Sequence, residues 1–211
     1  MNLYQKRLKK ARKITWFLQL APFIRMIGLN GSMTRGEIKK ESDIDFLVVA
    51  KQGRIWTSRF FVTILTHLTG QRRYGNKIAG RICLNRYQTD QFLEIKPHDF
   101  YHARTFSSLA PLYDQNLYPK YQRENKWMEE FGFKVSPGVK INPVRGPILN
   151  FLREIEEAVL SGRLGNWLEK NLRNYQIKRI LRDKRTYEAP KGRIRISDWE
   201  ICLHPKKEGV G

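Results

Sequence analysis

Two aspartates, Asp43 and Asp45, flank Ile44 at the start of the apolar run 44–50. This run is dense in β-branched and aromatic residues, and it predicts a strand. Because side chains alternate along a strand, those of residues 43 and 45 leave the same face. Two neighbouring carboxylates repel each other unless a cation lies between them. Mg²⁺ prefers such oxygen ligands and keeps positions for phosphate oxygens and water. Asp43 and Asp45 therefore predict a metal site for phosphate chemistry.

A second group with phosphate chemistry lies upstream, at Gly31 and Ser32. Ten residues separate Ser32 from Asp43, and the pair follows a predicted strand over 23–29. A small glycine permits a phosphate to approach the backbone, whose N–H groups and the serine hydroxyl can then donate to it. The two groups together predict a phosphate cradle beside a metal clamp, which is what nucleotidyl or phosphoryl transfer requires.

The stretches Gly-Ser-Met-Thr-Arg-Gly (31–36) and Ser-Asp-Ile-Asp (42–45) resemble the DNA polymerase β-type nucleotidyltransferase superfamily. The similarity is greatest to its minimal nucleotidyltransferase branch, and it covers roughly residues 20–95. The resemblance implies that Gly31 and Ser32 contact the triphosphate of an NTP. It also implies that Asp43 and Asp45 hold two Mg²⁺ ions, and that the enzyme transfers an NMP to an acceptor hydroxyl.

The resemblance further implies a third carboxylate from a later strand, which activates the acceptor hydroxyl and completes the metal site. The corresponding strand, predicted over 81–87, contains no acid. Asn85 is the nearest match there, although an amide cannot take a proton. Asp90 and Glu94 follow downstream, and of these Glu94, within Phe-Leu-Glu-Ile, is the better placed. We therefore predict Asp43, Asp45 and Glu94 as the catalytic set, with Asn85 and Asp90 as alternatives.

The elements that position these residues follow from hydrophobic periodicity. An amphipathic helix is predicted over 4–20, a long helix over 55–69 and a further helix over 98–113. Two more helices are predicted over 147–160 and 164–182, and a short strand or hairpin over 192–203. This order predicts an α/β (α+β) fold with a mixed β-sheet flanked by helices. We place a nucleotidyltransferase domain, including the N-terminal helix, at 1–115 and a mainly helical region at 116–211.

The chain carries a formal net charge of +20 at pH 7. A field of this sign attracts polyanions and disfavours cationic acceptors. We therefore expect NTP as a partner together with an anionic acceptor such as nucleic acid, with a protein acceptor as the alternative. No membrane-spanning segment is expected, and the two cysteines, Cys83 and Cys202, have no metal-ligand spacing. Two reduced, buried thiols in a cytoplasmic protein are the interpretation that this pattern favours.

Two basic segments allow more than one interpretation. Arg72, Arg73 and Lys77, with Tyr74 among them, form a loop that either grips a nucleic-acid backbone and stacks a base or is simply solvated. The lysine-rich run 6–13 is interpreted as the polar face of a docked helix, with a secondary electrostatic role.

Two functions from different classes agree with these features. The first is an enzyme that transfers an NMP from an NTP to an acceptor with Mg²⁺. The second is a catalytically weakened domain that binds NTP or nucleic acid without turnover. What occupies the third acidic position distinguishes the two.

Overall fold

The computed structural model describes residues 1–190 and 193–203. Its helices are α1 (Leu3–Leu18), α2 (Ser32–Arg35), α3 (Ile55–Leu68), α4 (Phe100–Phe106), α5 (Tyr118–Glu124), the 3₁₀ helix η1 (Lys126–Phe131), α6 (Pro147–Val159), α7 (Arg163–Leu181) and α8 (Lys184–Tyr187). Its strands are β1 (Ile24–Asn30), β2 (Ile44–Ala50), β3 (Ile82–Thr89), β4 (Ala110–Asp114), β5 (Ile194–Ile196) and β6 (Glu200–Leu203).

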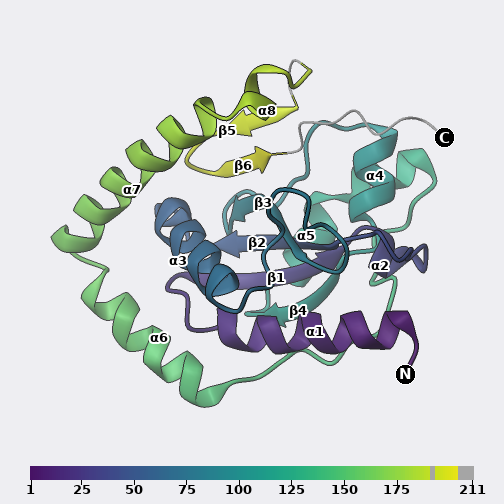
Figure 1. The fold of residues 1–211 in the computed structure, drawn as a ribbon, viewed down its shortest axis with the longest axis horizontal. Coiled ribbons are helices and arrows are strands. Elements are labelled where there is room, and N and C mark those ends of the chain that lie inside the picture. Colours follow the sequence, from purple (N-terminus) through teal and green to yellow (C-terminus); the bar gives the residue numbers. More distant parts are fainter. Residues whose placement is uncertain (191–192, 204–211) are drawn as a thin grey trace.

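Within the described residues, six strands form one sheet in the order β4-β1-β2-β3-β6-β5. β2 and β3 run parallel, and α3 connects them as a crossover helix, whereas the other neighbouring pairs are antiparallel. Figure 1 shows this sheet at the centre of the molecule with helices on both faces. The mixed α/β fold predicted from the sequence is therefore confirmed.

The core forms two layers, one on each face of the sheet. On β2, Phe46 and Val48 pack with α1, α3 and α7, whereas Leu47 and Val49 pack with α4 and α5. This alternation explains why the strand reads as a continuous apolar run, because a central strand buries both of its faces. β2 is thereby fixed between two layers, and its first residues are held at one end of the sheet.

The helix predicted over 98–113 is wrong in its second half. The helix α4 ends at Phe106, and residues 110–114 form the edge strand β4, which pairs with β1. Pro111 explains the difference, since proline breaks a helix interior but is tolerated in an edge strand. Leu109, Ala110 and Leu112 are instead buried directly before this strand and within it.

The C-terminal segment contributes to the sheet as well as covering it. The hairpin of β5 and β6, predicted within 192–203, forms over its described residues and pairs with the free edge of β3. Arg86 on β3 is 1% exposed and forms an ion pair with Glu200 on β6. Residues 116–203 thus supply strands to the sheet besides helices, and the domain boundary at 115/116 stays a prediction. The predicted helices over 147–160 and 164–182 are confirmed as α6 and α7.

Helices α6 and α7 form an arm around one side of the molecule (Figure 1). The arm is attached to α3 through Glu169, whose carboxylate accepts hydrogen bonds from Trp56 N at 3.0 Å and Thr57 N at 2.8 Å. It also accepts one from the Thr57 hydroxyl at 2.6 Å. Glu169 therefore provides the acceptor for orphan N–H groups in the first turn of α3, because the side chain of the N-cap residue does not cap the helix.

Replacing Glu169 with alanine is expected to destabilise the fold by about 2 kcal/mol, because two buried N–H groups and a hydroxyl lose their acceptor. For a chain of this size that loss lowers Tm by about 4–8 °C. Thermal unfolding followed by circular dichroism measures the shift. Glu154→Ala is the matched control, since Glu154 is an exposed glutamate on α6. Equal Tm values for the two variants would contradict the role of Glu169.

In the part of the chain that the structure describes, none of the helices has both the length and the apolar character needed to cross a membrane. Cys83 and Cys202 are both free and buried, as the sequence predicted.

Candidate active site

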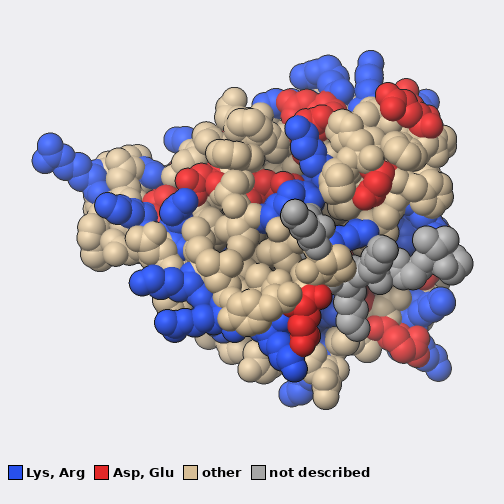
Figure 2. All heavy atoms as spheres, turned by 90° about the horizontal axis from the view of Figure 1, so that it is seen from above, with Lys and Arg blue, Asp and Glu red and all other residues tan. Residues whose placement is uncertain are grey.

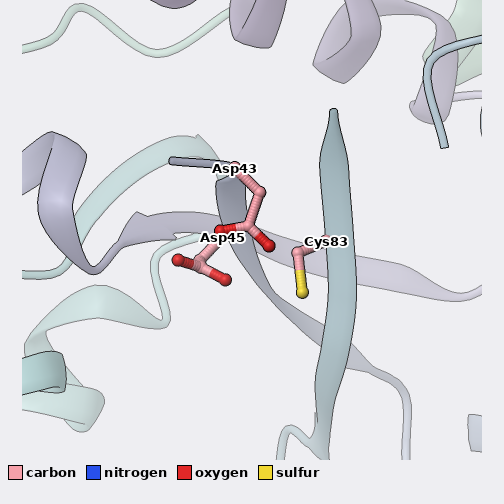
Figure 3. A group of neighbouring side chains, drawn as sticks. All are labelled: Asp43, Asp45 and Cys83. Atoms are coloured by element: carbon pink, nitrogen blue, oxygen red, sulfur yellow. The ribbon is translucent and has the colours of Figure 1, made fainter. Parts of the chain in front are cut away.

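The two predicted metal-binding aspartates meet at one end of β2. Asp45 lies within the strand, between Asn30 of β1 and Cys83 of β3, and Asp43 directly precedes the strand. One carboxylate oxygen from each aspartate and the sulfur of Cys83 all lie within 4.8 Å of one another. Figure 3 shows these three side chains directed toward one another. The side chains of Asp43 and Asp45 therefore share one site, as the strand geometry predicted.

Gly31 lies against this cluster and has no room for a side chain. Its φ is +72°, a left-handed conformation that favours glycine, and a Cβ there would stand 2.7 Å from Asp45 Oδ2. The Gly31 carbonyl accepts hydrogen bonds from the backbone N–H and the hydroxyl of Thr34, at 3.2 and 3.1 Å, which fix the turn into α2. Ser32, half-buried, begins this short helix. The predicted phosphate-binding pair is thus adjacent to the predicted metal ligands.

Comparison with known families identifies the segment that carries this site. Residues 8–108 match the model of the nucleotidyltransferase domain family. These residues form a nucleotidyltransferase domain. Neither the curated proteins nor the solved structures searched contain a match to the chain.

A guanidinium group already faces the aspartates of the nucleotidyltransferase domain. Arg73 Nη1 lies 2.5 Å from Asp43 Oδ2 and 3.7 Å from the sulfur of Cys83. The loop that carries Arg73 is held in place because Arg73 N donates to Ile82 O and Ile82 N donates to Gln71 O, at 2.9 and 2.8 Å. Neither interpretation of the basic loop around Arg73 predicts that this arginine pairs with Asp43. The positive charge of Arg73 therefore offsets part of the repulsion between the two carboxylates.

Cys83 lies beside Asp45 on β3, the later strand from which the family resemblance implies a third carboxylate. Burial raises the pKa of the Cys83 thiol, and the negative charges of Asp45 and Asp43 raise it further, against the opposing effect of Arg73. The group is therefore a neutral thiol at pH 7, a poor proton acceptor and a poor ligand for Mg²⁺. Sequence reasoning missed this residue, although apolar neighbours flank Cys83 in β3 as they flank Asp45 in β2.

Asn85 and Asp90, the two alternatives for the third position, lie within β3 and directly after it. Asn85 sits where the register between β2 and β3 shifts, between the partners of Asp45 and Leu47. Asp90 follows the far end of β3, and its N–H donates to Ala50 O. Five residues separate Asp45 from Ala50, or about 17 Å of strand. Asp90 is therefore remote from the cluster.

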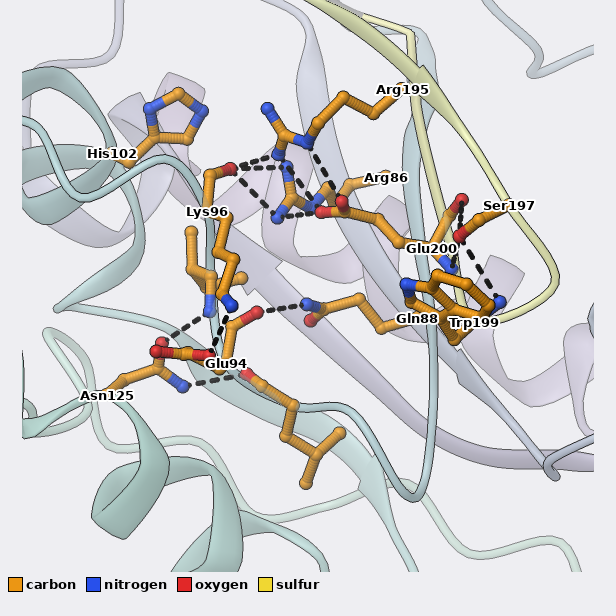
Figure 4. Close-up of polar contacts among 12 residues, drawn as sticks. Arg86, Gln88, Glu94, Lys96, His102, Asn125, Arg195, Ser197, Trp199 and Glu200 are labelled. Atoms are coloured by element: carbon orange, nitrogen blue, oxygen red, sulfur yellow. Dashed lines mark hydrogen bonds and ion pairs between the residues drawn. The ribbon is translucent and has the colours of Figure 1, made fainter.

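Glu94 also lies away from the aspartates, which corrects its predicted catalytic placement. The backbone carbonyl of Glu94 accepts a hydrogen bond from Gln88 Nε2 at 2.8 Å, and Gln88 pairs with Val49, about 13 Å along β2 from Asp45. The carboxylate itself contacts Lys96 at 3.0 Å and His98 at 2.9 Å. Figure 4 shows Glu94 in this second group of polar side chains, beneath the β5–β6 hairpin. Glu94 follows the Thr89 end of β3, which in this parallel pair lies beside Ala50, at the end of β2 away from Asp45.

Proposed function

We propose that this chain transfers a nucleoside monophosphate from an NTP to an acceptor hydroxyl, with Mg²⁺, and releases pyrophosphate. The observation that carries the proposal is the convergence of Asp43 and Asp45 at the end of β2 in a nucleotidyltransferase domain. The left-handed Gly31 supports it, because a residue without a side chain lets the turn after β1 pass directly against the Asp45 carboxylate.

The residues present fit Mg²⁺, which proteins commonly hold through one or two carboxylates together with substrate phosphates. Asp43 and Asp45 would be those ligands, and when bound there the ion supplies neutralisation of the charge on phosphate oxygens. Gly31 and Ser32 would orient the triphosphate. Arg73, once it leaves Asp43, can pair with phosphate oxygens through its guanidinium fork. The acceptor proton would pass to solvent, because Cys83 is a neutral thiol.

We propose that the acceptor is anionic, with nucleic acid preferred over a protein hydroxyl. We also propose that the reaction takes place in the cytoplasm. Figure 2 shows Lys and Arg spread over much of the visible face, with Asp and Glu in smaller groups among them. With a net charge of +20, this surface attracts a polyanion and repels a cationic small alcohol.

A second candidate function is binding of NTP or nucleic acid without turnover. It is favoured by the thiol of Cys83, in place of a third carboxylate, beside the two aspartates and by the ion pair between Arg73 and Asp43. A site with only two carboxylates can bind a metal–nucleotide complex but has no residue in place to deprotonate the acceptor.

Label transfer from α-³²P-NTPs distinguishes the two functions. Each nucleotide is incubated with Mg²⁺, the protein, and either RNA or protein acceptors, beside the Asp43→Asn/Asp45→Asn double variant. Label that appears on an acceptor and is absent with the double variant establishes the transferase. If no acceptor is labelled but Mg²⁺-dependent NTP binding is measured by calorimetry, the domain binds without turnover. Absence of label, of NTP binding and of nucleic-acid binding contradicts both functions.

Glu94→Gln is expected to transfer label at the wild-type rate, since its carboxylate contacts Lys96 and His98 and not the aspartates. The label-transfer assay measures this directly, under saturating NTP and acceptor. A large fall in rate, with unchanged Tm, would return Glu94 to the catalytic set.

A further inference from the structure

A groove of about 490 Å³ lies between α1 and the residues that follow α3. Lys6, Lys9, Lys10 and Lys13 line it from α1, and Gln71 lines it from the loop after α3. The four lysines follow the i, i+3, i+4, i+7 spacing of a single helix face. The sequence suggests that this run is the polar face of a docked helix. In the structure, these four lysines also border a concave surface.

The positive charge of this groove is not compensated. None of its lining residues is acidic, and within residues 1–190 and 193–203 none of the four ammonium groups forms an ion pair. Burial lowers the pKa of Lys10, and the neighbouring Arg81 and Arg7 lower it further. Such crowding of cations is relieved when an anion binds. The mixed charges of the face in Figure 2 contrast with this stripe of a single sign.

The groove is connected to the aspartate cluster by a short path of hydrogen bonds. Lys10 Nζ donates to Gly80 O at 3.0 Å, and Gly80 N donates to Ser42 O at 2.8 Å, one residue before Asp43. Gln71, on the other wall, is two residues from Arg73, which contacts Asp43. The groove therefore borders the backbone segment that leads into Asp43 and the loop that carries Arg73. Tyr74, in the same loop, is 70% exposed and offers a ring on which a base can stack.

We propose that this groove binds the phosphate backbone of a single-stranded nucleic acid and directs its end toward Asp43 and Asp45. The lysine stripe matches one backbone, because lysines recur at each helical turn of about 5.4 Å, close to the spacing of phosphates in an extended strand. A duplex presents two backbones across a groove about 12 Å wide, which one stripe cannot contact together. The part of this proposal that makes the nucleic acid an acceptor rests on the proposed transferase function.

The test measures binding of a fluorescein-labelled 12-nucleotide uridine RNA by anisotropy, in EDTA and without NTP. Lys6→Gln/Lys9→Gln/Lys13→Gln is expected to bind about 100-fold more weakly at 0.1 M salt and to lower the salt slope by about 2, because three phosphate contacts are lost. Lys10 is left intact because it also bonds Gly80. Lys6→Arg/Lys9→Arg/Lys13→Arg is expected to keep binding, since the charge remains.

The matched control is Lys126→Gln/Lys134→Gln/Lys140→Gln, which removes the same charge from exposed lysines outside the groove. Equal affinity for the two Gln triple variants overturns the proposal. So does lysine-dependent binding to vesicles of anionic phospholipid with no binding of RNA. If the groove variant alone loses RNA binding while wild-type protein labels no RNA, the groove stands and the acceptor role fails with the transferase function.

Discussion

Asp45→Asn is expected to lower the rate of Mg²⁺-dependent nucleotidyl transfer by about 10³-fold, the largest loss from any single replacement in the domain. The asparagine keeps the size and the position beside Gly31 but removes the negative charge that a divalent cation requires. The strand is flanked by β1 and β3 and is buried on both faces beyond this point, so the fold itself should persist. Initial rates of label transfer, measured with saturating NTP, give the effect.

The comparison with Asp43→Asn makes this prediction sharper. Both variants remove one carboxylate of the pair, but only Asp43→Asn also breaks the ion pair with Arg73. We expect both to lose transfer, and Asp43→Asn to lower Tm in EDTA, where the ion pair is intact in the wild type. Wild-type transfer by Asp45→Asn would mean that the reaction does not depend on this cluster.

Cys83→Asp is expected to raise the rate of transfer by about 10²–10⁴-fold, the range that a positioned general base contributes. The new carboxylate would stand beside Asp45 in the parallel pair of β2 and β3, where it can accept the proton of the acceptor hydroxyl. It would also add a hard oxygen ligand in place of a thiol that Mg²⁺ disfavours. The rate of label transfer is again the measurement.

The same variant makes a prediction about stability that is independent of turnover. Three carboxylates within a few ångströms repel one another, so Cys83→Asp should have a lower Tm than wild type in EDTA. Mg²⁺ should restore that Tm, because an ion that binds only the folded state stabilises it. Cys83→Asn is the control of similar size without charge. If Mg²⁺ restores the Tm of Cys83→Asp but its rate stays at the wild-type level, the third position does not limit turnover.

The sequence predicts the parts of the site that depend on local order. The strand over 44–50 has the predicted bounds, because a run of β-formers that is buried on both faces admits little else. Gly31 is likewise predictable, since a left-handed turn after a strand favours glycine. The helices α6 and α7 follow from periodicity and from the Ser161–Gly162 break between them. In each case the structural cause lies within a few residues of the feature.

The parts that the sequence does not predict depend on pairing between distant segments. Whether Cys83, Asn85 or Glu94 meets the aspartates is decided by the register of β3 against β2, which no local pattern contains. The Arg73 contact depends on a loop that folds back onto β3. The strand β4 depends on its pairing with β1, which is distant in the sequence. The lysine groove requires α1 to lie against the loop after α3, 50 residues away in the chain. Spacing alone predicts the lysine stripe but not the concave surface beside it.

The β5–β6 hairpin affects when the sheet can be completed during synthesis on the ribosome. The strand β3 and the aspartate cluster beside it are synthesised early, but the strand that covers the edge of β3 is among the last described residues. Until Glu200 emerges, the guanidinium of Arg86 lacks its carboxylate partner and keeps its hydrogen bonds to Lys96 O. An open strand edge on a nascent chain also invites pairing with other chains. The sheet that holds the aspartate cluster is therefore complete only after residues 194–203 have left the exit tunnel.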